Sequence, residues 1–166
     1  MIFTTENESI GNALEGTVDR ACFILRGLGF IYNYVWTGSS VVVEHYHFVE
    51  ARAKPDFDIE LTTGLEIEAE CKNLGFRKKD YIKDGGSEYW LQDYTWVQDN
   101  IIRKDWTEGV TKLLITTSLT LFTTEATRLL LKFFGASIIQ TGHQVTGTQK
   151  DLEMMILELN QQFKSI

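Results

Sequence analysis

The chain has 166 residues, 43% of them hydrophobic, which suffices for one domain with a substantial core, so we expect a single domain over residues 1–166. Its formal net charge of −7 argues against a protein that coats nucleic acid nonspecifically, because such binding needs many Lys and Arg contacts to phosphate. No apolar run approaches the roughly 20 residues that span a bilayer, and the start MIFTTENESI lacks the order of a secretory signal, so we expect a cytoplasmic protein without membrane contact.

The N-terminal third is predicted as one helix followed by two strands. Apolar residues recur at helical spacing over about residues 8–28, at Ile10, Leu14, Val18, Ala21, Leu25 and Leu28. Thr5 and Glu8 fit a capping box ahead of this helix, and Gly29 fits a C-terminal cap. The next stretch, 30–51, is aromatic and β-branched with a Gly-Ser turn in its middle, which predicts two strands.

The remaining chain is predicted to alternate between strands and helices. Strands at 54–61 and 65–72 form a hairpin, whose loop of Thr62, Thr63 and Gly64 suits a glycine in the left-handed position. The later predicted elements are a helix at 87–104, a buried strand at 112–118, a helix at 124–134, a strand at 136–142, and a closing helix at 148–163 opened by Thr148 and Asp151. This order predicts an α/β or α+β fold, with a central mixed sheet flanked by helices on both faces.

The predicted hairpin carries its acidic residues on one face. Strand alternation puts on that face Asp56, Asp58 and Glu60 of the first strand and Glu66, Glu68, Glu70 and Lys72 of the second. The loop sets Glu60 opposite Glu66, Asp58 opposite Glu68, and Asp56 opposite Glu70. Like charges directly opposite one another destabilise a sheet. A solvated outer face is the simplest explanation of acidic strands, but three successive like-charged pairs favour a functional site with a metal ion between the carboxylates.

The spacing of these residues resembles that of a known family. Pro55-Asp56 followed by Glu70-Cys71-Lys72 matches the Pro-Asp and acid-any-lysine pattern of the PD-(D/E)XK nuclease superfamily, which includes restriction-endonuclease-like and Holliday-junction-resolvase-like enzymes. The predicted order of elements over residues 8–142 is also similar to the family core. The resemblance implies a restriction-endonuclease-like core and a metal-dependent endonuclease that hydrolyses phosphodiester bonds in DNA.

The resemblance also implies roles for individual residues. Asp56, Glu70 and the main-chain carbonyl of Cys71 would bind Mg²⁺ or Mn²⁺, which prefer hard oxygen ligands. Lys72 would orient the attacking water or neutralise the negative charge that develops on the phosphate. Glu15, on the first predicted helix, matches an acidic residue that many family members place beside the metal, and would be a third ligand, directly or through water. An ordinary exposed helix residue is the alternative for Glu15.

Several neighbouring residues are secondary candidates. Asp58 and Glu68 form an acidic pair that would line the edge of the site or hold a second ion, and Asp19 is a weaker metal ligand on the first helix. The basic run after the motif predicts nucleic-acid contacts or a solvated face, and consists of Arg77, Lys78, Lys79 and Lys83. His45 and His47 share one face of a predicted strand and are interpreted as structural, since no third soft ligand is visible.

These features lead to three functional hypotheses. The first is an endonuclease whose partner is DNA, serving restriction, repair or junction resolution, and acting as a homodimer because cutting two strands from one site takes two turnovers. The second is a catalytically silent nucleic-acid-binding module on the same fold, although its expected sign, a missing acid or lysine, is absent from the motif. The third is an acidic protein-interaction module, which would bind without divalent metal and weaken with salt.

Overall fold

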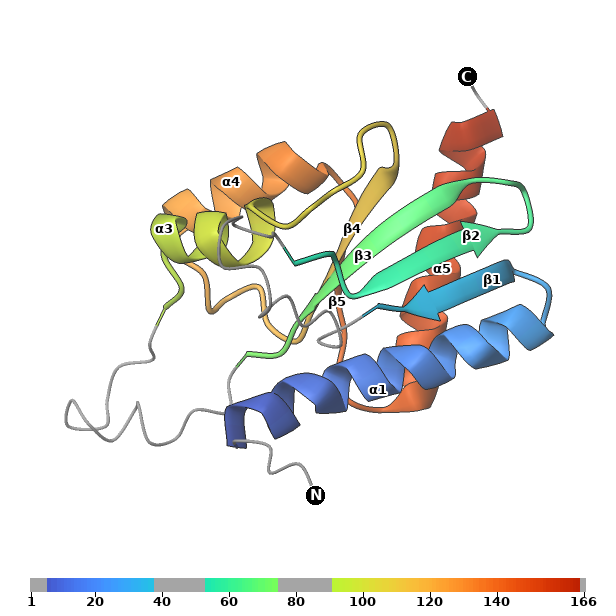
Figure 1. Cartoon of the computed structure of the whole chain (residues 1–166), viewed down its shortest axis with the longest axis horizontal. Helices are drawn as coiled ribbons and strands as arrows, with labels where there is room; N and C mark the ends of the chain where they lie inside the picture. Colours follow the sequence, from blue (N-terminus) through green and yellow to red (C-terminus); the bar gives the residue numbers. More distant parts are fainter. Residues whose placement is uncertain (1–5, 38–52, 75–90, 165–166) are drawn as a thin grey trace, which may run out of the picture.

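The computed structural model describes residues 6–37, 53–74 and 91–164 and shows a five-stranded mixed sheet packed with helices (Figure 1). In chain order the elements are α1 (Glu6–Gly27), β1 (Ile31–Trp36), β2 (Phe57–Leu61), β3 (Glu66–Lys72), α3 (Tyr94–Val97), η2 (Gln98–Ile102), β4 (Thr111–Thr116), α4 (Thr124–Phe134), β5 (Ile138–Gln140) and α5 (Val145–Lys164). The predicted mixed α/β class is confirmed. The second strand expected within 30–51, and Thr5 of the expected capping box, lie outside the described residues.

The sheet has the strand order β1-β2-β3-β4-β5. The pairs β1–β2 and β2–β3 are antiparallel, whereas β3–β4 and β4–β5 are parallel. The predicted hairpin register is confirmed, since Asp58 pairs with Glu68 and Glu60 pairs with Glu66. Gly64 closes the hairpin loop at φ 94°, a left-handed conformation that glycine adopts without strain. The loop therefore fixes which carboxylates lie opposite one another.

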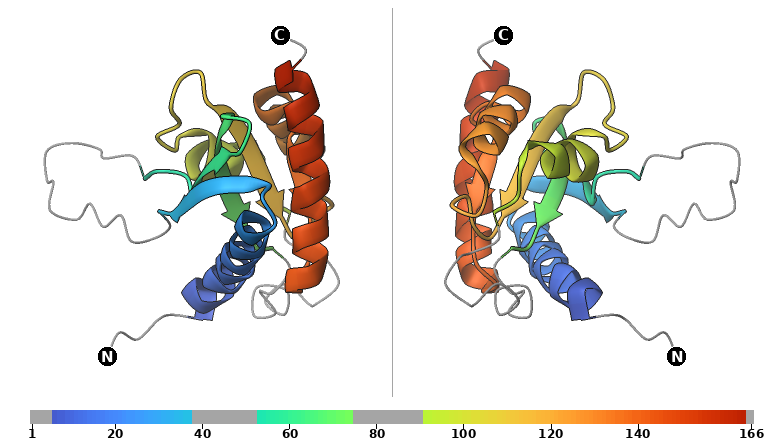
Figure 2. Two further views of the ribbon diagram at one scale, coloured as in Figure 1. Left: turned by 90° about the vertical axis from the view of Figure 1, so that its right-hand side faces the viewer. Right: turned by 90° about the vertical axis from the view of Figure 1, so that its left-hand side faces the viewer.

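The first face of the sheet is covered by α1 and α5. The side chains buried in this core include Leu14, Val18, Ala21, Cys22 and Leu25 of α1, Phe57, Ile59 and Leu61 of β2, and Leu152, Met155, Ile156 and Leu159 of α5. The two helices also pack against each other, with α1 inclined to α5 (Figure 2). The apolar side of the predicted hairpin thus faces the core, and its carboxylates are directed to the opposite side.

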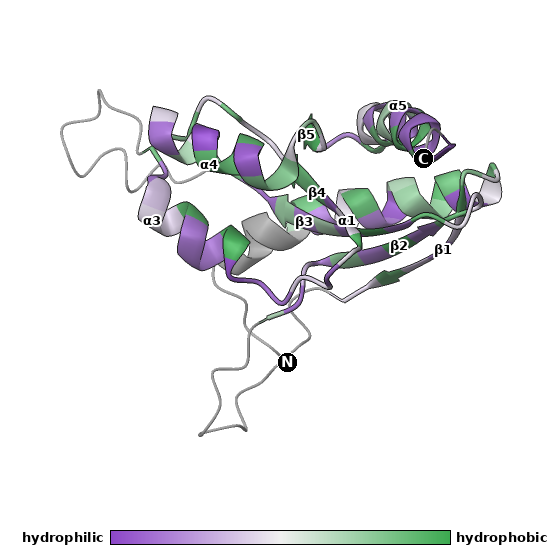
Figure 3. Ribbon diagram, turned by 90° about the horizontal axis from the view of Figure 1, so that it is seen from above, coloured by the Kyte–Doolittle hydropathy of each residue, from purple (hydrophilic) through white to green (hydrophobic). Residues whose placement is uncertain are grey.

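A second core lies on the other face, near β4. Val97 of α3 and Ile101 of η2 are buried there together with Leu114 of β4, whereas Leu113 and Ile115 belong to the first core. Helices therefore cover β4 on both faces, as predicted. Seen from above, α3 and α4 lie together at one end of the molecule, and α1 lies between α5 and the strands β1 and β2 (Figure 3). Among the described residues, none from β1 or β2 enters the second core, which leaves their acidic face outside it.

The prediction of one regular helix over 87–104 is wrong, because the helix starts later and includes a π-helical turn. α3 begins only after Asp93, whose side chain accepts a hydrogen bond from the Trp96 N–H at 2.8 Å. The chain then passes into the π-helical turn η2, where the Arg103 N–H donates to the carbonyl of Gln98 at 3.0 Å. Apolar spacing indicates that a helix is present. It does not locate the residue that caps the helix, and it does not reveal a single wider turn within it.

Three smaller expectations are also corrected. β2 begins at Phe57 rather than 54, because Pro55 has no N–H to give to a strand partner. α5 begins at Val145, so that Thr148 is a buried residue of the helix instead of its opening cap. Leu28, expected on the apolar side of the first helix, is 58% exposed because α1 ends at Gly27.

Candidate functional site

Asp56 and Glu70 meet where β2 begins beside β3. Asp56 is 8% exposed, and its Oδ2 accepts a hydrogen bond from the Cys71 N–H at 2.8 Å. The carboxylate takes the place of a backbone partner, since the pairing of β2 with β3 ends at Phe57 and Ala69. The N–H and C=O of a strand residue point to the same neighbouring strand, so the Cys71 carbonyl faces the side of Asp56 as well. The three oxygen donors expected from the sequence therefore gather at one end of the hairpin.

Glu70 is fully buried, and within the described part of the chain neither of its oxygens accepts a hydrogen bond. Two ammonium groups approach Oε2, with Lys72 Nζ at 3.2 Å and Lys104 Nζ at 3.4 Å. Burial, followed by the charge of Asp56, raises the pKa of Glu70 from 4.5 to about 8, while the two lysines act in the opposite direction. A cation bound between the two carboxylates would reduce both the repulsion and the cost of burial.

Lys72 reaches Glu70 from the last residue of β3 and is held on its other side by an aromatic ring. Its Nζ lies 5.6 Å from the centre of the Trp96 ring, within the range of a cation–π interaction. Trp96 is fixed in turn by two contacts. Its backbone N–H donates to the side chain of Asp93, and its ring centre lies 6.3 Å from that of Phe122. With only 20% of its side chain exposed, Lys72 is positioned by its surroundings and not free in solvent.

Glu15 of α1 lies beside Asp56. It is 8% exposed, and its Oε1 accepts a hydrogen bond from Trp36 Nε1 at 2.9 Å. Burial, followed by the charge of Asp56, raises the pKa of Glu15 from 4.5 to about 7. Glu15 is thus a buried residue near the two expected metal ligands, and the alternative of an exposed helix residue is wrong. Asp19, one turn later, interacts with Tyr34 instead.

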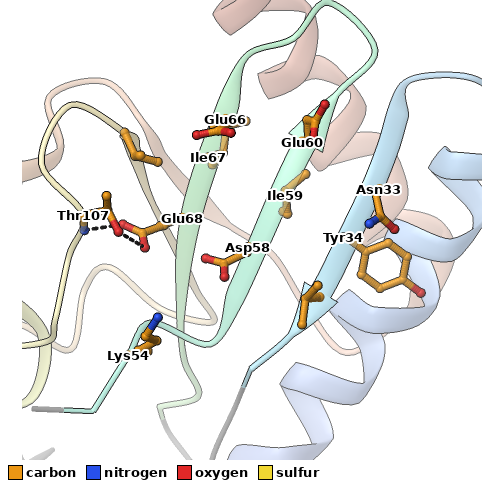
Figure 4. Close-up of a pocket in the computed structure, with 12 residues that line it drawn as sticks. Asn33, Tyr34, Lys54, Asp58, Ile59, Glu60, Glu66, Ile67, Glu68 and Thr107 are labelled. Carbon is orange, nitrogen blue, oxygen red and sulfur yellow. Dashed lines mark hydrogen bonds between the residues drawn. The ribbon is translucent and has the colours of Figure 1, made fainter. Parts of the chain in front are cut away.

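Asp58 and Glu68 occupy a separate hollow of about 280 Å³ on the acidic face (Figure 4). Glu68 is buried and accepts two hydrogen bonds from Thr107, one from the N–H at 2.6 Å and one from Oγ1 at 2.9 Å. Burial, and then the charge of Glu68, raises the pKa of Asp58, whereas Lys54 lowers it. Glu68 therefore has backbone and hydroxyl partners that Glu70 lacks, which distinguishes the two acidic pairs.

Three contacts of these carboxylates were not predicted from the sequence. Lys104 reaches Glu70 from the turn after η2, Thr107 reaches Glu68 from the same segment, and Trp36 reaches Glu15 from β1. Each contact joins elements far apart in the chain, so local spacing carries no signal for it. The only signal in the sequence was the acidic pattern itself, because buried carboxylates need positively charged groups or hydrogen-bond donors nearby.

Some candidates fall outside the described residues. They are the basic run of Arg77, Lys78, Lys79 and Lys83, and the strand histidines His45 and His47. Among the residues that the structure does describe, no three His, Cys, Asp or Glu side chains are grouped as a metal site. The oxygen donors at the end of the hairpin are therefore the carboxylates of Asp56 and Glu70 and the main-chain carbonyl of Cys71. Glu15 lies next to Asp56.

Comparison with known proteins adds no relative, because no family model, curated protein or solved structure matches the chain. Over the described ranges, no helix has the length and apolar character to cross a membrane. The geometry of the carboxylates and lysines is accordingly the main guide to function.

Proposed function

We propose that the protein is a metal-dependent endonuclease that hydrolyses phosphodiester bonds in DNA. The observation that carries the proposal is the buried pair of Asp56 and Glu70, in which the oxygens of Glu70 accept no hydrogen bond from the described residues, beside Lys72. Burial of Glu70 beside a second carboxylate raises its pKa even though two lysines contact it, and such a cost is expected at a site that binds a cation.

The donors at this site fit a hard divalent cation. Asp56 and Glu70 would hold Mg²⁺ or Mn²⁺ together with the Cys71 carbonyl, because these ions prefer carboxylate and carbonyl oxygens. Glu15 would complete the set directly or through water. A bound ion of this kind polarises a phosphate oxygen and lowers the pKa of coordinated water.

The residues of the chain itself would orient the reacting groups. Lys72 has its ammonium 3.2 Å from Glu70 and so would lie within reach of a phosphate that approaches the same ligands. From there it would position the attacking water or balance the charge that develops on the phosphate. Trp96 limits the directions that the lysine can take, which reduces the entropy lost on reaching that position.

The arrangement of elements supports the same proposal. A helix, three antiparallel strands and then parallel strands with an intervening helical segment follow one another in the order expected of a restriction-endonuclease-like core. The acid-any-lysine motif stands on β3, the strand at which the sheet changes from antiparallel to parallel. DNA is accordingly the proposed partner, with a homodimer as the form that cuts both strands.

One observation favours a second candidate, a catalytically silent nucleic-acid-binding or protein-interaction module. Lys72 and Lys104 balance the charge of Glu70 without any metal. In that case the lysines would be structural partners of a buried carboxylate, and neither metal binding nor cleavage would be observed.

Cleavage of labelled duplex, single-stranded and four-way-junction DNA, with Mg²⁺ or Mn²⁺ and with EDTA, tests the proposal. We expect metal-dependent cutting that falls roughly 100-fold or more in Asp56→Asn, which weakens a metal ligand, and in Lys72→Met, which removes a positive charge beside the reacting phosphate. Lys150→Met, on the exposed side of α5, is the matched control and should cut normally. Absence of cutting on every substrate, with no metal bound, would support the silent module instead.

A further inference from the structure

Lys104 makes a contact that the proposed function does not use. Its Nζ lies 3.4 Å from Oε2 of Glu70, the same oxygen that Lys72 approaches at 3.2 Å. Its side chain is 20% exposed, far less than an ordinary surface lysine. Two ammonium groups therefore share one carboxylate oxygen at the proposed metal site, although a single lysine would neutralise it.

The turn that carries Lys104 is anchored by the two residues that follow it. The Asp105 N–H donates to the carbonyl of Ala53 at 2.8 Å, which ties the turn to the segment leading into Asp56. Trp106 donates from Nε1 to the Ile101 carbonyl at 3.0 Å. The Trp106 ring also packs edge-on against two rings of α4, those of Phe133 and Phe134, with centres 5.6 and 5.5 Å away.

These anchors make Lys104 a built part of the site. The turn is held to the segment before the hairpin and to the second core, while rotation about the bonds of the long lysine side chain would redirect its ammonium group. A divalent ion bound by Asp56 and Glu70 would repel the two ammonium groups that now contact Glu70. Lys72 already has a second partner in the face of Trp96. Lys104 would be the group that moves.

We propose that Lys104 is a second catalytic lysine, which leaves Glu70 when the cation binds and then contacts the phosphate that is cut. This inference rests on the proposed function, because it needs a metal and a phosphodiester at the same carboxylates. Lys72 and Lys104 would approach the phosphate from separate elements, the end of β3 and the turn after η2. One lysine would serve the attacking water and the other the negative charge of the phosphate oxygens.

The test separates metal binding from cleavage in Lys104→Met, Lys104→Arg and the control Lys150→Met. Mn²⁺ affinity is measured by calorimetry without DNA in alkaline buffer, and single-turnover cleavage is measured at saturating metal. We expect Lys104→Met to bind Mn²⁺ at least as tightly as the natural chain, because a competing positive charge is gone, yet to cut roughly 100-fold more slowly. Lys104→Arg keeps the charge and should recover most of the rate.

Each outcome decides a different question. Equal cleavage by Lys104→Met and Lys150→Met would overturn the role of Lys104 and leave the nuclease intact. A parallel loss of Mn²⁺ affinity and rate that Lys104→Arg does not restore would also overturn it, since that pattern marks a structural partner of Glu70. Failure of the natural chain to bind Mn²⁺ or to cut any DNA would remove the proposed function itself and the role of Lys104 with it.

Discussion

At the scale of single residues, the site is defined by three neighbouring buried carboxylates. Their hydrogen bonds and ion pairs do not fully offset the cost of burial and the repulsion between them. Asp56 has the Cys71 N–H, Glu15 has the Trp36 indole, and Glu70 has the ammonium groups of two lysines. The raised pKa values of Glu15 and Glu70, about 7 and about 8, have burial as their first cause and Asp56 as their second. Positive charge at this point would therefore act on all three carboxylates at once.

Replacement of Glu15 tests whether it is a metal ligand. Glu15→Gln keeps an oxygen that can accept the Trp36 hydrogen bond but removes the negative charge. We expect Mn²⁺ affinity to fall roughly 10-fold, as for residues that support a metal site. The metal-free protein should gain stability above about pH 7, where Glu15 is ionised in the natural chain and repelled by Asp56. Calorimetry and thermal unfolding measure the two effects.

Asp19→Asn is the matched control on the same helix. Asp19 lies one helical turn from Glu15 and interacts with Tyr34. Removal of the Asp19 charge should therefore leave Mn²⁺ affinity unchanged. Unchanged affinity in Glu15→Gln as well would show that Glu15 supports the site only through its contact with Trp36.

At the scale of elements, local patterns predicted the parts of the fold that local geometry determines. The hairpin register followed from strand alternation and from Gly64, and it placed Asp58 opposite Glu68 as observed. The regular helix expected across η2 was wrong, because a π turn depends on packing and not on periodicity. The site divides in the same way: the acidic pair was visible in the sequence, whereas Lys104 comes from tertiary packing.

The end of α1 gives a prediction at this scale. The Phe30 N–H donates to the Leu25 carbonyl at 2.9 Å and the Gly29 N–H to the Arg26 carbonyl at 3.2 Å, which is the Schellman arrangement, with Gly29 at φ 89°. Gly29→Ala should lower the free energy of unfolding by about 1–2 kcal/mol, because other residues adopt a left-handed backbone only with strain. Urea unfolding measures the change.

Gly27→Ala is the control for this helix end. Gly27 is the last helical residue, its φ is not left-handed, and an added Cβ would meet no atom within 4 Å. Alanine there should raise the stability by about 0.4–1 kcal/mol through the unfolded chain. Equal effects of the two substitutions would contradict the assignment of the cap to Gly29.

At the scale of the whole molecule, pH acts on folding through the buried carboxyls at which we propose that the metal binds. Glu15 and Glu70 have pKa values raised from 4.5 to about 7 and about 8, so the folded chain retains protons that the unfolded chain has lost. Their contribution to stability is therefore complete below about pH 4.5 and declines as pH rises to about 8. A divalent ion bound to the ionised carboxylates would oppose this decline, because its affinity would rise as protons leave.

Glu70→Gln separates these two effects in thermal unfolding scans. Without metal, the natural chain should lose stability relative to Glu70→Gln as pH rises from about 4.5 to about 8, because Glu70 ionises only in the natural chain, whereas Glu15 ionises in both proteins. Mn²⁺ at about 100 times its dissociation constant should then stabilise the natural chain by about 2.7 kcal/mol, or roughly 5–10 °C in Tm, at alkaline pH. The shift should shrink in acid and be lost in Glu70→Gln. An equal shift in both proteins would place the ion elsewhere, and the hollow of Asp58 and Glu68 would be the next site to substitute.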